Sequence, residues 1–212
     1  MDIKPAQYYT LERREMLRFM PRGVKTVLEV GCAEGHFGTI LRSTGVEEVW
    51  GIEVCERAAL EATKKLDKVL VADIDTAASS LPHDYFDCII FNDILEHLSD
   101  PWGVLSQTRN SLKEDGSIVA SIPNVRYFPH IKRLLWNCEW TYTDWGLLDR
   151  THLRFFTKNS IIDLFATCGF TIHTLVGINE YTSKKFNLLN LLCAHRLDDM
   201  KYLQFACVAR KT

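Results

Sequence analysis

The 212-residue sequence lacks paired cysteines, an excess of one charge and a long apolar run. Its seven cysteines show no C-x-x-C spacing and are odd in number, which argues against a zinc site or a disulfide framework and favours a reducing, cytoplasmic location. The net charge of −2 offers no electrostatic grip on DNA or RNA, so we expect no nucleic-acid partner. No apolar stretch approaches the roughly 20 residues of a membrane span, and the N-terminus lacks the apolar core of a secretion signal.

Apolar runs alternate with helical patterns along the chain, and the length suits one domain with a substantial core. The buried-looking run 88–91 is typical of a strand covered on both faces. This alternation predicts an α/β fold, a parallel sheet with helices on both faces, whose last two strands pair antiparallel because no convincing helix separates them. We predict strands at 25–30, 47–53, 69–73, 86–92, 116–122, 170–178 and 202–210, and helices at 36–43, 55–66, 101–113 and 157–168, after a segment of helical spacing at 8–20.

The most informative segment is a glycine turn that follows the first predicted strand. A strand that ends in glycines and leads into a helix brings backbone N–H groups close to a ligand. The dinucleotide fingerprint G-x-G-x-x-G fails here, because its positions hold Gly31, Ala33 and His36. The pattern acid-x-Gly-x-(Gly/Ala)-x-Gly fits instead, as Glu29, Gly31, Ala33 and Gly35.

This pattern resembles motif I of the class I S-adenosylmethionine-dependent methyltransferases. The resemblance implies a Rossmann-like, seven-stranded, mostly parallel sheet with an antiparallel last strand, and S-adenosylmethionine as the cofactor. That cofactor has no pyrophosphate to cradle, but its methionine ammonium requires an acid and carbonyls nearby. The cofactor-binding residues expected from the resemblance are Tyr9, Glu29, Gly31, Cys32, Ala33, Gly35, Glu53, Val54, Asp73, Ile74, Asn92 and Asp93.

Two acids at strand ends would hold the nucleoside. Glu53 follows Gly31 by 22 residues, the expected place for a carboxylate that binds a ribose. In the resembled family an acid after the third strand accepts from the adenine amino group, and the next residue packs on the ring. Asp73 and Ile74 match by position, although Asp75 competes for the first role.

The segment after the fourth strand resembles the family's Leu-Glu-His motif followed by an Asp-Pro turn. Asn92 would face the methionine end of the cofactor, and Asp93, Glu96 and His97 would lie near the methyl group. In some ubiquinone-biosynthesis O-methyltransferases a Glu-x-x-Glu-His set binds a divalent cation. Here the first acid is the shorter Asp93, so we expect no metal. His97 is either a general base or a structural residue of the turn.

Residues 123–156 form a long insertion rich in aromatic side chains, and a loop of this size is usually functional. Its end, Asp-Arg-Thr-His-Leu-Arg-Phe-Phe-Thr, resembles a signature of methyltransferases from sugar, polysaccharide and other small-metabolite biosynthesis. The expected substrate contacts are Arg126, Tyr127, His152 and Arg154, and the expected catalytic residues are His97, His152 and Asp93. Alternatively, Asp144 or Asp149 pairs with Arg150 or Arg154 and fixes the loop.

We therefore expect one methyltransferase domain over 1–212, with an N-terminal lid at 1–22 that places Tyr8 and Tyr9 over the cofactor or in the core. A second insertion, 179–200, carries an amphipathic stretch that would cap the active site or bury itself in a homodimer. The expected reaction is methyl transfer to an oxygen or nitrogen of a small metabolite, such as a sugar, a nucleotide sugar or another anionic intermediate. The alternatives are a nicotinamide-dependent oxidoreductase and a non-catalytic binding module.

Overall fold

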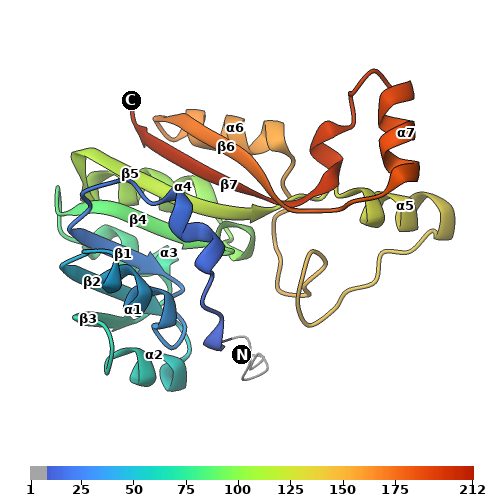
Figure 1. The fold of residues 1–212 in the computed structure, drawn as a ribbon. Coiled ribbons are helices and arrows are strands. Elements are labelled where there is room, and N and C mark those ends of the chain that lie inside the picture. Colours follow the sequence, from blue (N-terminus) through green and yellow to red (C-terminus); the bar gives the residue numbers. More distant parts are fainter. Residues whose placement is uncertain (1–8) are drawn as a thin grey trace.

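A seven-stranded sheet organises the computed structural model, which describes residues 9–212 (Figure 1). The predicted role of Tyr8 and part of the predicted lid therefore lie outside the described residues. The strand order is β3-β2-β1-β4-β5-β7-β6, and β7 runs antiparallel to both β5 and β6. The strands are β1 (Thr26–Val30), β2 (Glu48–Glu53), β3 (Lys68–Val71), β4 (Phe86–Asn92), β5 (Leu112–Pro123), β6 (Phe170–Glu180) and β7 (Tyr202–Lys211).

The helices cover both faces of this sheet, so the predicted fold class is confirmed. They are α1 (His36–Ser43), α2 (Glu56–Ala62), α3 (Ile74–Ala77), α4 (Pro101–Thr108), α5 (Phe128–Asn137), α6 (Lys158–Thr167) and α7 (Lys184–Leu192). Short 3-10 turns are η2 (Arg14–Phe19), η3 (Ala78–Ser80), η4 (Leu95–His97), η5 (Arg109–Ser111) and η6 (Asp198–Lys201).

Alternating residues of each central strand enter two separate cores. In β4, Ile89 and Phe91 join the cluster under α3, α4 and α6, whereas Cys88 and Ile90 join the cluster under η2, α1 and α2. All four side chains are fully buried, as expected where successive side chains of a strand point to opposite faces. The two cores leave the carboxyl ends of the parallel strands as the free edge, where ligands of such sheets bind.

The differences from the predicted elements are local. The helical spacing at 8–20 becomes the 3-10 turn η2 rather than a regular helix, and the helix expected at 55–66 ends at Ala62. The insertion 123–156 contains α5, which was not predicted. In Figure 1, α5 and α7 project together from the end of the sheet away from α1 and α2. Among the described residues, no helix is long and apolar enough to cross a membrane.

Candidate active site

The glycine turn is held in an uncommon backbone conformation at the carboxyl end of β1. Gly31, Ala33 and Gly35 have φ angles of 69°, 49° and 76°, a left-handed region that costs residues with a Cβ energy and that glycine adopts readily. The backbone N–H groups of Gly31 and Cys32 donate to the carbonyl of Ile52, at 2.8 and 3.1 Å. The turn is thereby tied to β2. Cys32 is buried, and burial raises the pKa of its thiol.

The two glycines face different neighbours. A Cβ on Gly31 would lie 2.1 Å from Cδ1 of Ile94, in the segment after β4. A Cβ on Gly35 would instead meet Ala62 and Leu66, at 3.2 Å from the nearest atom of each. Gly35 is thus required for its φ angle and for close packing with the α2 segment, and its predicted contact with the cofactor stays a prediction.

Glu53 clamps the turn from the end of β2. The side chain is 6% exposed, Oε2 accepts from the N–H of Ala33 at 2.9 Å, and Oε1 accepts from the N–H of Cys55 at 2.9 Å. Burial raises the pKa of this carboxyl, and these amides oppose the shift. A carboxylate has about four lone-pair sites, so acceptor sites remain for the two hydroxyls of a ribose.

Glu29 is a buried acid beneath the same turn. It is 4% exposed, and its Oε2 has no hydrogen-bond partner among the described residues. Burial raises the pKa of Glu29 from its usual value near 4.5 to about 8, the Gly38 amide opposes the rise, and the charge of Glu53 adds to it. At neutral pH this carboxyl is mostly protonated, and a cationic ligand group beside it would favour ionisation.

The contribution of Glu29 to the unfolding free energy is expected to fall as pH rises from about 4.5 to above 8, and Glu29→Gln is expected to remove it. The unfolded carboxyl ionises near 4.5, whereas the folded one holds its proton until about 8, so raising the pH stabilises the unfolded state. Between pH 5 and pH 8.5, the difference in unfolding free energy between Glu29→Gln and the wild type should change by on the order of 4 kcal/mol. Urea unfolding at pH 5 and pH 8.5 measures it, and an equal difference at both pH values would contradict the assignment.

Of the two predicted adenine contacts, Asp73 is exposed and Ile74 is buried. Asp73 is exposed and its Oδ1 caps α3 by accepting from the Asp75 amide at 3.0 Å. Ile74 is 4% exposed and belongs to the main core, so in this structure it is not free to pack on an adenine ring. Val54, which is 45% exposed beside Glu53, is an accessible apolar side chain at this edge.

Asn92 and Tyr9 are the remaining candidates for the methionine end. Asn92 ends β4, and both polar atoms of its amide are buried without a hydrogen-bond partner among the described residues. An orphaned amide that can both donate and accept fits a ligand carrying an ammonium and a carboxylate. Tyr9 is buried with its carbonyl accepting from the Glu34 amide at 3.3 Å, and the guanidinium of Arg57 lies over its ring.

Asp93 is held by side chains from three other segments of the chain. It has a φ of 55°, and its Oδ2 pairs with the guanidinium of Arg13. Its Oδ1 accepts from the hydroxyl of Ser121 at 2.8 Å and from the amide of Gln204 at 2.7 Å. Because both carboxylate oxygens are engaged, Asp93 is not placed as the free catalytic acid that we expected. The partners Arg13, Ser121 and Gln204 were missed, since no motif marks them.

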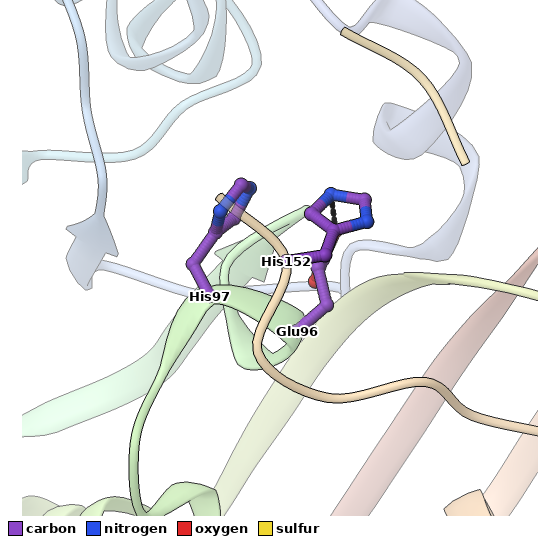
Figure 2. Close-up of side chains that lie close together, drawn as sticks. All are labelled: Glu96, His97 and His152. Atoms are coloured by element: carbon purple, nitrogen blue, oxygen red, sulfur yellow. Dashed lines mark ion pairs between the residues drawn. The ribbon is translucent and has the colours of Figure 1, made fainter. Parts of the chain in front are cut away.

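Glu96, His97 and His152 converge beyond this strand end (Figure 2). Glu96 and His97 come from η4, and His152 comes from the 123–156 insertion. The two imidazole rings meet edge to face with their centroids 4.6 Å apart, and Nε2 of His152 lies 3.9 Å from Oε1 of Glu96. The insertion is anchored here because the Glu96 carbonyl accepts from the amides of Leu153 and Arg154, at 2.8 and 3.0 Å.

The electrostatics of this cluster favour neutral groups. Burial, and secondarily the charge of His97, lowers the pKa of His152 from 6.5 to about 4. Burial, and secondarily the charge of Asp93, holds the pKa of Glu96 well above its usual range. Nδ1 of His152 lies 3.0 Å from the Leu147 carbonyl. A carbonyl only accepts, so this nitrogen carries the proton and Nε2 keeps its lone pair.

The same three side chains could hold a divalent cation. Each offers one ligand atom, and these atoms all lie within 4.8 Å of one another. Neither carboxylate oxygen of Glu96 has a hydrogen-bond partner among the described residues, and two imidazoles with one carboxylate suit several transition metals. This set contains His152 rather than Asp93, the residue that occupies the first position of the Glu-x-x-Glu-His set in the resembled family. The expectation of no metal stays a prediction.

The other substrate candidates are engaged within the protein. Arg126 pairs with Asp199 of η6 through Nε at 2.8 Å. Arg154 is exposed and donates to the Ser99 carbonyl. Tyr127 precedes α5 and packs edge to face on Tyr181. The alternative of an internal ion pair is confirmed for the loop itself, where Arg150 lies 2.7 Å from Asp144.

Comparison with known proteins identifies the family. The methyltransferase domain family matches residues 6–175. Ubiquinone biosynthesis O-methyltransferases from Neisseria meningitidis and Idiomarina loihiensis are 33% and 31% identical over 132 and 107 residues, which are 58% and 47% of this chain and 52% and 43% of those proteins. The matched segments thus span about half the length of these curated relatives.

Solved structures share the fold. An S-adenosylmethionine-dependent methyltransferase from Archaeoglobus fulgidus has a TM-score of 0.69 at 19% identity, with 93% of this chain and 91% of that chain covered. A possible histamine N-methyltransferase from Thermotoga maritima has a TM-score of 0.67 at 18% identity, covering 97% and 89%. The family match over most of the chain decides against the nicotinamide alternative. The chain belongs to the methyltransferase-domain family, and it shares the fold of S-adenosylmethionine-dependent methyltransferases.

Proposed function

We propose that the protein transfers a methyl group from S-adenosylmethionine to an oxygen or nitrogen atom of a small metabolite. The observation that carries this proposal is the lone pair of His152 Nε2, held in a buried cluster with His97 and Glu96 just beyond the end of β4. Relatives named as O-methyltransferases of ubiquinone biosynthesis and a structural neighbour named as a possible histamine N-methyltransferase support a small acceptor.

The cofactor would be held by polar groups at the sheet edge that can still donate or accept hydrogen bonds. Glu53 would accept from the ribose hydroxyls, while Glu29 and the orphaned amide of Asn92 would meet the methionine end. When bound, S-adenosylmethionine supplies a methyl group on an electrophilic sulfonium. The protein then mainly aligns the acceptor. His152 Nε2 would take the acceptor's proton, with His97 as the adjacent second base.

The acceptor would enter beside the two insertions, with residues 9–22 as the described part of a lid, all within one domain. An anionic acceptor, such as a sugar phosphate, a nucleotide sugar or another charged intermediate of the cytoplasm, is favoured by cationic side chains at the base of the insertions. A cavity of about 410 Å³ lies there, lined by Arg126, Lys158, His195 and Arg196 with Asp198 and Asp199. These side chains come from the end of β5, the start of α6 and the η6 segment.

His152→Ala is expected to leave the affinity for S-adenosylhomocysteine within about twofold and to lower methyl transfer on the order of a hundredfold, the usual contribution of a positioned base. Calorimetry measures the first quantity, and release of S-adenosylhomocysteine from labelled donor with a panel of hydroxylated, amine and nucleotide-linked metabolites measures the second. Arg133→Ala, which removes an exposed ion pair with Glu139 in the same insertion, is the matched control. Binding without transfer to any acceptor would favour the non-catalytic module.

Methyl transfer measured in the presence of a chelator distinguishes a metal-free base from a set of metal ligands. Transfer that persists in a chelator assigns His152 as a metal-free base. Transfer that disappears and returns with Mg²⁺ or Mn²⁺ assigns Glu96, His97 and His152 to a cation and contradicts our expectation of no metal.

A further inference from the structure

The two insertions expose an apolar surface that the rest of the fold leaves uncovered. In α7 the side chains of Leu188, Leu189, Leu191 and Leu192 are 59%, 39%, 60% and 76% exposed. The buried residues of this helix are Phe186 and Asn190, and Phe186 packs on Phe128 of α5 with ring centroids 4.6 Å apart. We call the leucines of α7, with Leu135 and Trp136 of α5, the leucine–tryptophan face.

This face is a concentration rather than the scattered exposure of ordinary surfaces. Leu135 and Trp136 are 66% and 73% exposed, and Figure 1 places α5 and α7 next to each other at the projecting end of the molecule. Exposed apolar side chains gathered on two helices that pack together in this way are typical of a surface that binds another protein or a membrane.

The charges around the face are mostly cationic. Lys132 of α5 and Lys184 and Lys185 of α7 have no carboxylate partner among the described residues. Of the nearby acids, Glu139 pairs with Arg133 at 3.0 Å and Glu180 pairs with Lys201 at 3.2 Å, which leaves Asp198, beside Asn190 of α7, as one acid against the three lysines. The net charge that the face offers a partner is therefore positive.

The two lysines of α7 also occupy an unfavourable place in their own helix. They are its first two residues, and its first turn contains no acid. The positive end of a helix dipole disfavours cations there. Their location therefore gains little from the helix itself and suits an external anionic partner.

We propose that the leucine–tryptophan face docks on an anionic phospholipid surface, with the leucines and Trp136 in the interface and the three lysines at the head groups. Exposed leucine and tryptophan beside lysine is the composition of interfacial helices. A second copy of the chain would be the competing occupant, and it would give a dimer that the leucine substitutions dissociate. The inference goes beyond the proposed function and does not depend on it.

Co-sedimentation with vesicles tests the proposal. Binding to phosphatidylglycerol–phosphatidylcholine vesicles at 0.1 M salt is expected to exceed binding to pure phosphatidylcholine at least tenfold and to weaken as salt is raised. The variant Leu188→Ser/Leu191→Ser is expected to lose at least tenfold in partitioning. Lys184→Gln and Lys185→Gln should each lose about fivefold, from the roughly 1 kcal/mol per cation at such surfaces.

The matched control is Leu60→Ser, because Leu60 of α2 is 64% exposed and lies outside the face. It should bind vesicles like the wild type, and all variants should keep the wild-type melting temperature and S-adenosylhomocysteine affinity. Absence of vesicle binding, an equal loss in Leu60→Ser, or a dimer in light scattering that only the Leu188→Ser/Leu191→Ser variant dissociates would each overturn the proposal.

Discussion

Glu53→Ala is expected to lower the affinity for S-adenosylmethionine at least tenfold, the largest effect of any single side chain in the cofactor half. The substitution would remove the acceptor of both ribose hydroxyls, and hydrogen bonds to a charged group contribute about 1.5–3 kcal/mol each. The substitution would also leave the N–H groups of Ala33 and Cys55 without the carboxylate oxygens that accept from them, each at 2.9 Å. Because Ala33 has a φ of 49°, the turn loses an external restraint on a strained residue.

Calorimetry with S-adenosylhomocysteine measures this effect. Glu56→Ala removes an exposed carboxylate three residues further along and should leave the affinity unchanged. Circular dichroism should show an intact fold for both variants. A Glu53→Ala protein that is folded and binds as tightly as the wild type would remove Glu53 from the ribose site.

Asp93→Ala and Arg13→Ala are each expected to destabilise the protein by about 2 kcal/mol or more, with a strong coupling between them. The side chain of Arg13 is 17% exposed and that of Asp93 is 24% exposed, so removing either one leaves a poorly hydrated charge on the other. Arg13 also donates to Ser121 at 2.9 Å. Arg13 and Asp93 both have a left-handed backbone conformation, with φ angles of 47° and 55° respectively. Strain of this kind persists only where the surrounding structure maintains it.

A double-mutant cycle in urea measures the coupling, and the double variant should cost clearly less than the sum of the two single ones. Cofactor affinity should also fall, because Asp93 follows the orphaned amide of Asn92. Arg14→Ala is the control, since Arg14 is 68% exposed and, within residues 9–212, pairs with Glu12 alone. Additive effects of the two substitutions would show that the ion pair contributes nothing.

The turn and the strand ends could be predicted because they are local. A short apolar run followed by Gly31, Ala33 and Gly35 forms the same strand–turn–helix corner in any parallel sheet, and the 22-residue spacing places Glu53 at the next strand end. The order of helices and strands likewise follows from apolar patterns within short windows.

The partners of the acids could not be predicted, because they are distant in the chain. Arg13 meets Asp93 across 80 positions, and Gln204 meets it across 111. His97 and His152 were each candidate bases, but their convergence with Glu96 depends on how the 123–156 insertion returns to η4.

By itself, the sequence determined the α/β class, the glycine turn after β1 and the position of Glu53 at the end of β2, since periodicity and glycine placement act within a few residues. Only the tertiary structure decided that Asp93 is bound to Arg13, that Gly35 packs against the α2 segment, and that the leucines of α7 stay exposed. These outcomes depend on which distant side chains share a cavity or a surface, and packing of the whole chain sets that.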